Sequence, residues 1–189
     1  MKNPDSYFLL TDLSDEYRTF IQVYKLKKDA WKESVSRNSY DSPHGKYPQQ
    51  FVPIELKLEK WRGKPIGDIT AGLSPFFVFS DSAVEHLMSL LCAGGEFLET
   101  NFDSKGFKGY RVTKFLDKNV LDMNFVSLKQ YENGLFLIGD PFFIYEKIKE
   151  FDIFMLKEIP LKVFVSSKFK EAIEKNNLKG FNFKKVNVI

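Results

Sequence analysis

The sequence predicts an α+β fold with a mainly antiparallel or mixed sheet. Apolar runs of strand length outnumber helical patterns, and their spacing suits hairpins better than long crossovers. A strand-helix-strand pattern also occurs twice, over about residues 76–98 and 162–186. A chain of 189 residues fits one domain and can bury a core without disulfides or metal. We therefore expect a single α+β domain over residues 1–189.

Residues 1–75 form a strand-rich N-terminal part to which the sequence assigns no role. Aromatic and β-branched residues predict strands over 7–10 and 19–26, although a helix stays possible for the second. Residues 34–50 are rich in Ser, Asn and Pro, which predicts a surface loop. In FVPIELKL, apolar and charged residues alternate, which predicts a half-buried strand with this inward set: Val52, Ile54, Leu56 and Leu58.

The middle of the chain carries the strongest hairpin signal. Asn133-Gly134 stands between two apolar segments, as in two-residue hairpin turns. The segments PFFIYEKI and FDIFML that follow are each ambiguous between a short strand and a buried helical turn. A closing unit over residues 161–186 ends the protein.

The two strand-helix-strand segments align with one another. Ser80 to Gly94 and Ser166 to Gly180 are equal intervals of fourteen residues. When the two serines are superposed, these residues also coincide: Glu85 with Glu171, Leu87 with Ile173, and Phe97 with Phe183. We interpret the pair as one module used twice.

Each module has local signals for its helix. Ser82 and Glu85 form an S-x-x-E capping box, while Ser166 or Ser167 can cap the second helix. Apolar residues recur at helical spacing, which predicts one buried stripe for each helix: Val84, Leu87, Met88 and Leu91, then Phe169, Ala172 and Ile173. Glycines stand where the helices end and can adopt a positive φ: Gly94 or Gly95, and Gly180. An anion site at these helix starts is the weaker interpretation, because neither SDS nor SSK supplies a glycine-rich turn.

Composition restricts the classes of function. Aromatic residues make up 16% of the chain, including 20 Phe, which indicates a Phe-rich core. Net charge is +3, and only four of the 28 basic residues are arginine, a pattern that argues against specific nucleic-acid binding. The single Cys92 lies in an apolar helical pattern and is expected to be a small buried residue. With no signal-peptide pattern and no apolar run long enough for a membrane helix, we expect a cytoplasmic protein without membrane contact.

Strong catalytic and metal-binding motifs are missing from the sequence, so we expect no catalytic residue, no metal and no cofactor. His86, within the first predicted helix, is most simply a surface histidine. Asp117 and Asp122 flank KNVL, and two acids near a turn are most often turn formers. Exposed Tyr, Trp and Arg dominate binding hot spots, so the residues expected to contact a partner are those of the polar loops: Tyr40, Tyr47, Trp61 and Arg62.

The order of several segments resembles a family of bacterial immunity proteins, first catalogued as a domain of unknown function and assigned to polymorphic toxin systems. The resemblance covers about residues 76–186 and ends in the LxGfxF pattern at Leu178, Gly180 and Phe183. Further residues carry it: Ser80, Leu87, Glu96, Phe97, Asp122, Phe142, Val165 and Ser166. The resemblance implies a non-catalytic cytoplasmic protein that binds and blocks a cognate toxin domain, as in a toxin-antitoxin pair.

Two alternatives from other classes stay open on the sequence. One is an enzyme of unrecognised class with a pocket near His86 or near Asp117 and Asp122. The other is weak nucleic-acid binding through the C-terminal third, where ten Lys stand against five acidic residues between Lys147 and Lys185. Their spacing among apolar positions is that of solvated faces.

Overall fold

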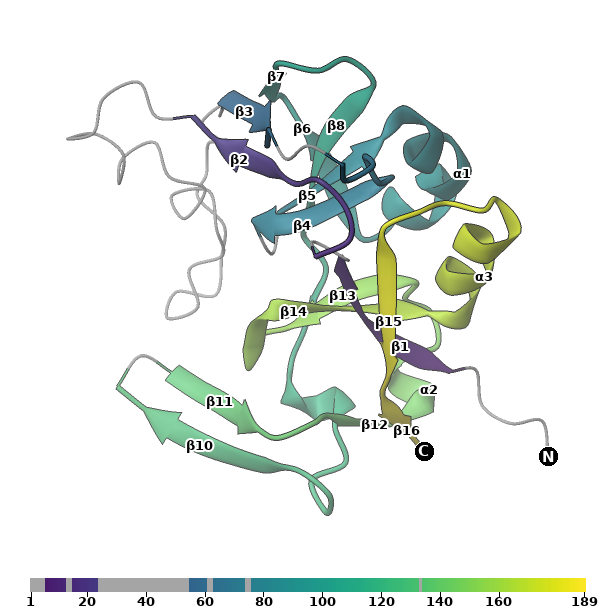
Figure 1. Cartoon of the computed structure of the whole chain (residues 1–189). Coiled ribbons are helices and arrows are strands. Elements are labelled where there is room, and N and C mark those ends of the chain that lie inside the picture. Colours follow the sequence, from purple (N-terminus) through teal and green to yellow (C-terminus); the bar gives the residue numbers. More distant parts are fainter. Residues whose placement is uncertain (1–5, 13–14, 24–54, 61–62, 74–75, 133) are drawn as a thin grey trace.

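The chain folds into a stack of β-sheets with helices along one side (Figure 1). The computed structural model describes residues 6–12, 15–23, 55–60, 63–73, 76–132 and 134–189. Mixed and antiparallel sheets with few helices confirm the predicted α+β class. Among the helices described, none combines the length and the apolar character that a membrane crossing needs.

Two larger sheets form the middle of the stack. The first has the order β15-β1-β14-β13-β9. Its strands are β1 (Tyr7–Asp12), β9 (Phe115–Leu116), β13 (Ile153–Leu156), β14 (Ile159–Ser166) and β15 (Phe181–Lys185). The second has the order β4-β5-β8-β6. Its strands are β4 (Ile69–Leu73), β5 (Phe76–Ser80), β6 (Gly95–Leu98) and β8 (Phe107–Val112).

Smaller sheets lie at the two ends of the stack (Figure 1). One end has the order β2-β3-β7, with strands β2 (Phe20–Gln22), β3 (Glu55–Leu58) and β7 (Asn101–Phe102). The other end has the hairpin of β10 (Ser127–Tyr131) and β11 (Gly134–Ile138), and the pair β12 (Phe142–Phe143) and β16 (Asn187–Val188). The helices within the described residues are α1 (Asp81–Leu91), α2 (Tyr145–Ile148), α3 (Ser167–Lys175) and the 3₁₀ turn Lys118–Val120.

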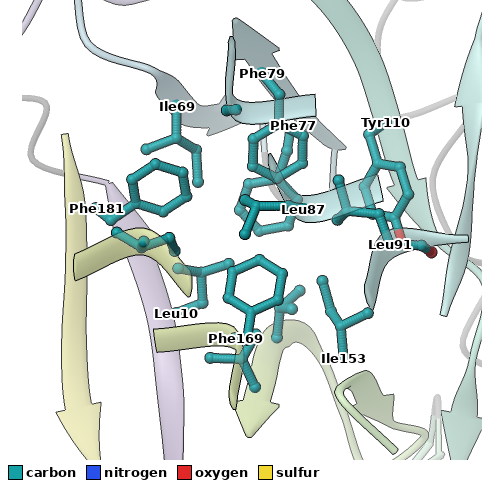
Figure 2. Close-up of a cluster of buried hydrophobic side chains, with 14 of the residues drawn as sticks. Leu10, Ile69, Phe77, Phe79, Leu87, Leu91, Tyr110, Ile153, Phe169 and Phe181 are labelled. Atoms are coloured by element: carbon teal, nitrogen blue, oxygen red, sulfur yellow. The ribbon is translucent and has the colours of Figure 1, made fainter. Parts of the chain in front are cut away.

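Three buried clusters hold these layers together. The central core lies between the two larger sheets and includes Leu87 of α1 and Phe169 of α3 (Figure 2). The hairpin core lies on the opposite face of the five-stranded sheet and includes Phe154 and Leu137. The β3 core joins the four-stranded sheet to the β2-β3-β7 end; its buried members are Phe20, Leu56, Leu58, Phe76 and Val78.

The continuous apolar runs are explained by this stacking. Along β5, Phe77 and Phe79 enter the central core, while Phe76 and Val78 enter the β3 core. Because side chains alternate between the faces of a strand, a strand covered on both faces has no polar position. Many phenylalanines fill these clusters, which confirms the predicted Phe-rich core; the fully buried ones are Phe20, Phe77, Phe79, Phe143, Phe154, Phe164 and Phe169.

The first helix starts differently from the predicted capping box. Its N-cap is Ser80, whose Oγ accepts the Ala83 N–H at 3.0 Å and donates to Asp68 Oδ1 at 2.6 Å. Ser82 lies inside the helix and is exposed, and so is Glu85. The S-x-x-E prediction was therefore wrong, because the end of β5 at Ser80 and the carboxylate of Asp68 fix the helix start two residues earlier.

The end of this helix corrects three further expectations. Cys92 is the C-cap and is exposed, so it is not a buried residue. Met88, assigned to the buried stripe, is 39% exposed; Ala83 takes the buried position beside Val84, Leu87 and Leu91. Gly94 and Gly95 do not have a positive φ. Close packing explains both glycines, since a Cβ on Gly94 would lie 2.5 Å from the Ile153 carbonyl oxygen and one on Gly95 would lie 2.3 Å from that of Arg111.

The second helix begins as predicted and ends on asparagine. Ser166 caps it, accepting the Phe169 N–H at 3.3 Å and donating to Asp152 Oδ1 at 2.6 Å. Asn177 has a φ of 54°, and the Leu178 N–H donates to the Ile173 carbonyl at 3.1 Å. This is a Schellman-type end, in which asparagine takes the left-handed position. Gly180 does have a positive φ, of 87°, but it lies beyond the helix.

Strand, helix and strand follow one another in both predicted segments, as β5-α1-β6 and β14-α3-β15. The two strands of each segment are not neighbours in their sheet. β8 lies between β5 and β6, and β1 lies between β14 and β15. β1 is antiparallel to both of its neighbours, with Leu9 opposite Phe164 and opposite Lys184. That the two segments are copies of one module stays a prediction.

The other strand predictions agree with the structure where it describes them. In β3, Leu56 and Leu58 are buried, and the charged Glu55 and Lys57 that alternate with them are exposed; Val52 and Ile54 lie outside the described residues. The segment PFFIYEKI contains a short strand followed by a helical turn, and FDIFML contains β13. The predicted loop over 34–50 also lies outside the described residues.

Candidate partner-binding surface

The residues that the sequence assigned to partner binding cannot be placed. Tyr40, Tyr47, Trp61 and Arg62 all lie outside the described residues. Described strands flank these segments: β2 ends before residues 24–54, and its partner β3 begins after them. These strands belong to the β2-β3-β7 end of the stack, the end opposite the hairpin (Figure 1).

The β10-β11 hairpin presents a face that is largely apolar and exposed. A hairpin forms where the Asn133-Gly134 signal predicts one, but its register differs from that of an Asn-Gly turn. Gly134 is itself paired with Tyr131, so the closing pair lies one residue earlier than such a turn would place it, and Ser127 pairs with Ile138. The paired residues Leu128 and Leu137 face the hairpin core. The opposite side, which we call the outer face, carries Ser127, Lys129, Tyr131, Phe136 and Ile138. Tyr131 is 42% exposed and Ile138 is 49% exposed.

Side chains of the outer face order one another. The rings of Tyr131 and Phe136 meet edge to face, with centroids 5.7 Å apart. Lys129 Nζ lies 5.1 Å from the centroid of the Tyr131 ring, within the range of a cation–π contact. Lys129 is also the only charged residue on this face. The face therefore combines aromatic and aliphatic surface with a single positive charge.

A second exposed apolar group precedes the hairpin. Phe125 is 61% exposed and Met123 is 51% exposed, and the Phe125 ring stacks on Phe142 with centroids 4.7 Å apart. We call these three residues the apolar corner. Asp122 fixes the turn, because its Oδ1 accepts the Asn124 N–H at 2.9 Å. A turn held in this way presents the two side chains at little entropic cost, which is a property of interface anchors.

The hairpin is fixed to the body of the protein through β11. The Leu137 N–H donates to the Glu158 carbonyl at 3.2 Å, and Leu137 is 9% exposed in the hairpin core. The Glu158 side chain is buried, and its Oε1 accepts the Lys118 N–H at 3.1 Å. Its Oε2 is a buried atom without a hydrogen-bond partner among the described residues.

Two exposed ion pairs involve residues that follow the hairpin in the chain. Lys184 Nζ lies 3.2 Å from Asp140 Oδ2, and Lys149 Nζ lies 2.6 Å from Glu146 Oε2. The hydrogen bond that Lys149 donates to Glu146, together with the negative charge of that carboxylate, raises the pKa of Lys149 above the usual lysine value. Exposed ion pairs of this kind add little stability.

The residues named for an alternative active site have structural roles. Asp117 caps the 3₁₀ turn by accepting the Asn119 N–H at 2.9 Å, and Asp122 holds the turn described above. Both are turn formers, as the sequence predicts. His86 is an exposed residue of α1, also as predicted. Within the described ranges no group of three or more His, Cys, Asp or Glu is placed to hold a metal ion.

Sequence reasoning missed the apolar corner. In a chain with 20 Phe, a single Phe is most simply a core residue, and Phe125 has no neighbouring pattern to separate it from the rest. The signal that could have found it is the D-x-N pattern at Asp122 and Asn124, which favours a turn and so an exposed position.

Comparison with known families finds a match over the part of the chain that carries this surface. The model of the Immunity protein family (Imm11) matches residues 121–188. The matched segment contains the apolar corner and the whole hairpin. The resemblance to an immunity protein family noted in the sequence is thereby confirmed over this segment. A search of curated proteins finds no match to the chain.

Proposed function

We propose that this chain is an immunity protein that binds a cognate bacterial toxin domain in the cytoplasm and neutralises it by direct contact, without catalysis of its own. The observation that carries the proposal is the match of residues 121–188 to an immunity protein family. A polymorphic toxin system, in which each toxin is paired with its own inhibitor, is the context that this family implies.

The exposed surface of the matched segment supports a binding role. Aromatic residues and Met are enriched in protein–protein interfaces, and the apolar corner and the outer face present exposed examples in Met123, Phe125 and Tyr131. Stable complexes of standard size bury about 1,600 Å² in total, which is more than one short hairpin offers. We therefore keep Tyr40, Tyr47, Trp61 and Arg62 as proposed further contacts.

Inhibition by charge mimicry does not fit this chain. An inhibitor that imitates a nucleic acid presents a dense negative field, whereas the net charge here is +3. Steric occlusion of the toxin through shape and apolar contact agrees better with a surface whose outer face has one charge, that of Lys129.

Survival of toxin-expressing cells tests the proposal. The gene next to this one is examined for a variable C-terminal toxin domain, which is expressed from an inducible promoter with or without this chain. We expect induction alone to kill the cells and co-expression to restore growth, with the two proteins co-purifying. A non-cognate toxin domain of the same fold is the matched control and should still kill. Death despite soluble chain, or rescue without complex formation, would reject neutralisation by direct contact.

A further inference from the structure

We propose that the outer edge of β10 receives an extended strand of the toxin domain, so that the hairpin becomes a three-stranded sheet. The incoming strand places an acidic side chain opposite Lys129 and apolar side chains beside Tyr131. The inference rests on the proposed function, which it deepens by naming the edge and the chemistry of the partner segment.

Hairpin geometry leaves backbone groups of β10 pointing outward. Tyr131 and Gly134 flank a two-residue loop, so they form a hydrogen-bonded pair, as do Lys129 with Phe136 and Ser127 with Ile138. The N–H and C=O groups of Leu128 and Gln130 therefore point away from β11. These backbone groups have no hydrogen-bond partner among the described residues.

The other edge of the hairpin is in use. On β11 the outward N–H of Leu137 donates to Glu158, which places this strand next to the turn between β13 and β14. Figure 1 shows β10 on the far side of the hairpin from that turn. An added strand can thus pair with β10 without displacing any part of the chain that the structure describes.

β10 has few of the features that keep strand edges from pairing. Proteins protect such edges with proline, bulges, or charged residues. The strand Ser127–Tyr131 contains no proline, and its register with β11 has no shift, whereas the pairings of β4 with β5 and of β13 with β14 are both irregular. Lys129 is the one protective feature, and it also selects the partner.

Lys129 favours a toxin strand over a second copy of this chain. Two copies of β10 that paired antiparallel over their whole length would meet at the central residue, so Lys129 would face Lys129. Like charges directly opposite are destabilising in a sheet, and opposite charges are stabilising. A strand with Asp or Glu at that position and apolar neighbours therefore fits the edge, while self-pairing does not.

Affinity measurements with an inactivated form of the toxin domain test the proposal. Gln130→Pro removes one outward N–H and should weaken binding about tenfold or more, whereas Gln130→Thr keeps it and should change binding less than about threefold. Lys129→Glu should weaken binding by about 5- to 30-fold. Lys168→Glu is the matched control, because Lys168 is an exposed residue of α3, which belongs neither to the hairpin nor to the strands that flank the proposed loop contacts, and the variant should bind like the wild type.

Amide exchange of the wild-type protein gives a readout that misfolding of a variant cannot imitate. In the free protein the amides of Leu128 and Gln130 should exchange fast, and on binding both should become protected. Binding without this protection, with Gln130→Pro and Lys129→Glu equal to wild type, would overturn the edge proposal and leave the immunity function intact. Self-association abolished by Gln130→Pro would overturn it in favour of a second copy. If the wild-type protein does not bind the toxin domain at all, the proposed immunity function is rejected, and the edge proposal is rejected with it.

Discussion

Replacing Ser80 and Ser82 by alanine separates the observed helix start from the one that local sequence predicts. Ser80 Oγ accepts one helix N–H and donates to the Asp68 carboxylate at 2.6 Å. Losing a serine N-cap costs about 1 kcal/mol, and losing a hydrogen bond to a charged group costs about 1.5–3 kcal/mol when it is buried. Because this site is only partly buried, we expect Ser80→Ala to lower the free energy of unfolding by about 2 kcal/mol.

Ser82→Ala is the matched control two residues away. Ser82 is exposed inside the first turn, so its replacement should change the free energy of unfolding by less than about 0.5 kcal/mol. Denaturation with urea, followed by circular dichroism, measures both variants. For a chain of this size 2 kcal/mol corresponds to a melting point lower by about 4–8 °C. Equal losses in the two variants, or a larger loss for Ser82→Ala, would refute the assignment of the cap.

A double-mutant cycle tests whether Asp68 acts through Ser80. Asp68 Oδ2 also accepts the Lys179 N–H at 2.7 Å, so Asp68→Ala should cost more than Ser80→Ala. The two losses should not add, with a coupling of about 0.5–3 kcal/mol. Strict additivity would mean that the short hydroxyl–carboxylate contact contributes nothing to stability.

Further predictions follow from burial. Leu87→Ala should lower the free energy of unfolding by about 3–5 kcal/mol and Met88→Ala by less than about 1 kcal/mol, measured by denaturation. Equal losses in the two variants would contradict the assignment of Leu87 to the buried face of the helix and of Met88 to the exposed face. Cys92 is exposed, so a thiol reagent should modify it in the native protein, and protection until unfolding would contradict that placement. Phe125→Ala should cost at most about 1.5 kcal/mol of stability but weaken toxin binding about tenfold or more in calorimetry; unchanged affinity would remove the apolar corner from the interface.

Local signals in the sequence predicted those elements whose cause is local. The Asn133-Gly134 pair indicated the hairpin. The continuous apolar runs indicated β5 and β14, because a strand that is covered on both faces is apolar at successive positions. The helix start was missed because SDS offers two serines, and the choice depends on Asp68, twelve residues upstream. A local motif cannot indicate the contact between Ser80 and Asp68, because that contact forms only when the chain folds.

Prediction of the site was limited in a different way. Composition can name residue types that favour binding, which led to Tyr40, Tyr47, Trp61 and Arg62. It cannot show which apolar side chains remain exposed after the core is filled. Phe125 and Phe154 look alike in the sequence, yet the first is 61% exposed and the second is fully buried. Only the packing of the hairpin core distinguishes them.

The family match covers less than the unit that must fold to present this surface. Residues 121–188 include β14 and β15, but these strands do not pair with each other, because β1 lies between them and bonds to both. Tyr7 of β1 also donates its hydroxyl to the Ile148 carbonyl at 2.7 Å, within the hairpin core. Without Tyr7–Asp12 the edges of β14 and β15 that β1 now pairs would be open, and the hairpin core would lack Tyr7. The hairpin therefore depends on the N-terminal strand for its position, and binding has to be assigned to the whole chain.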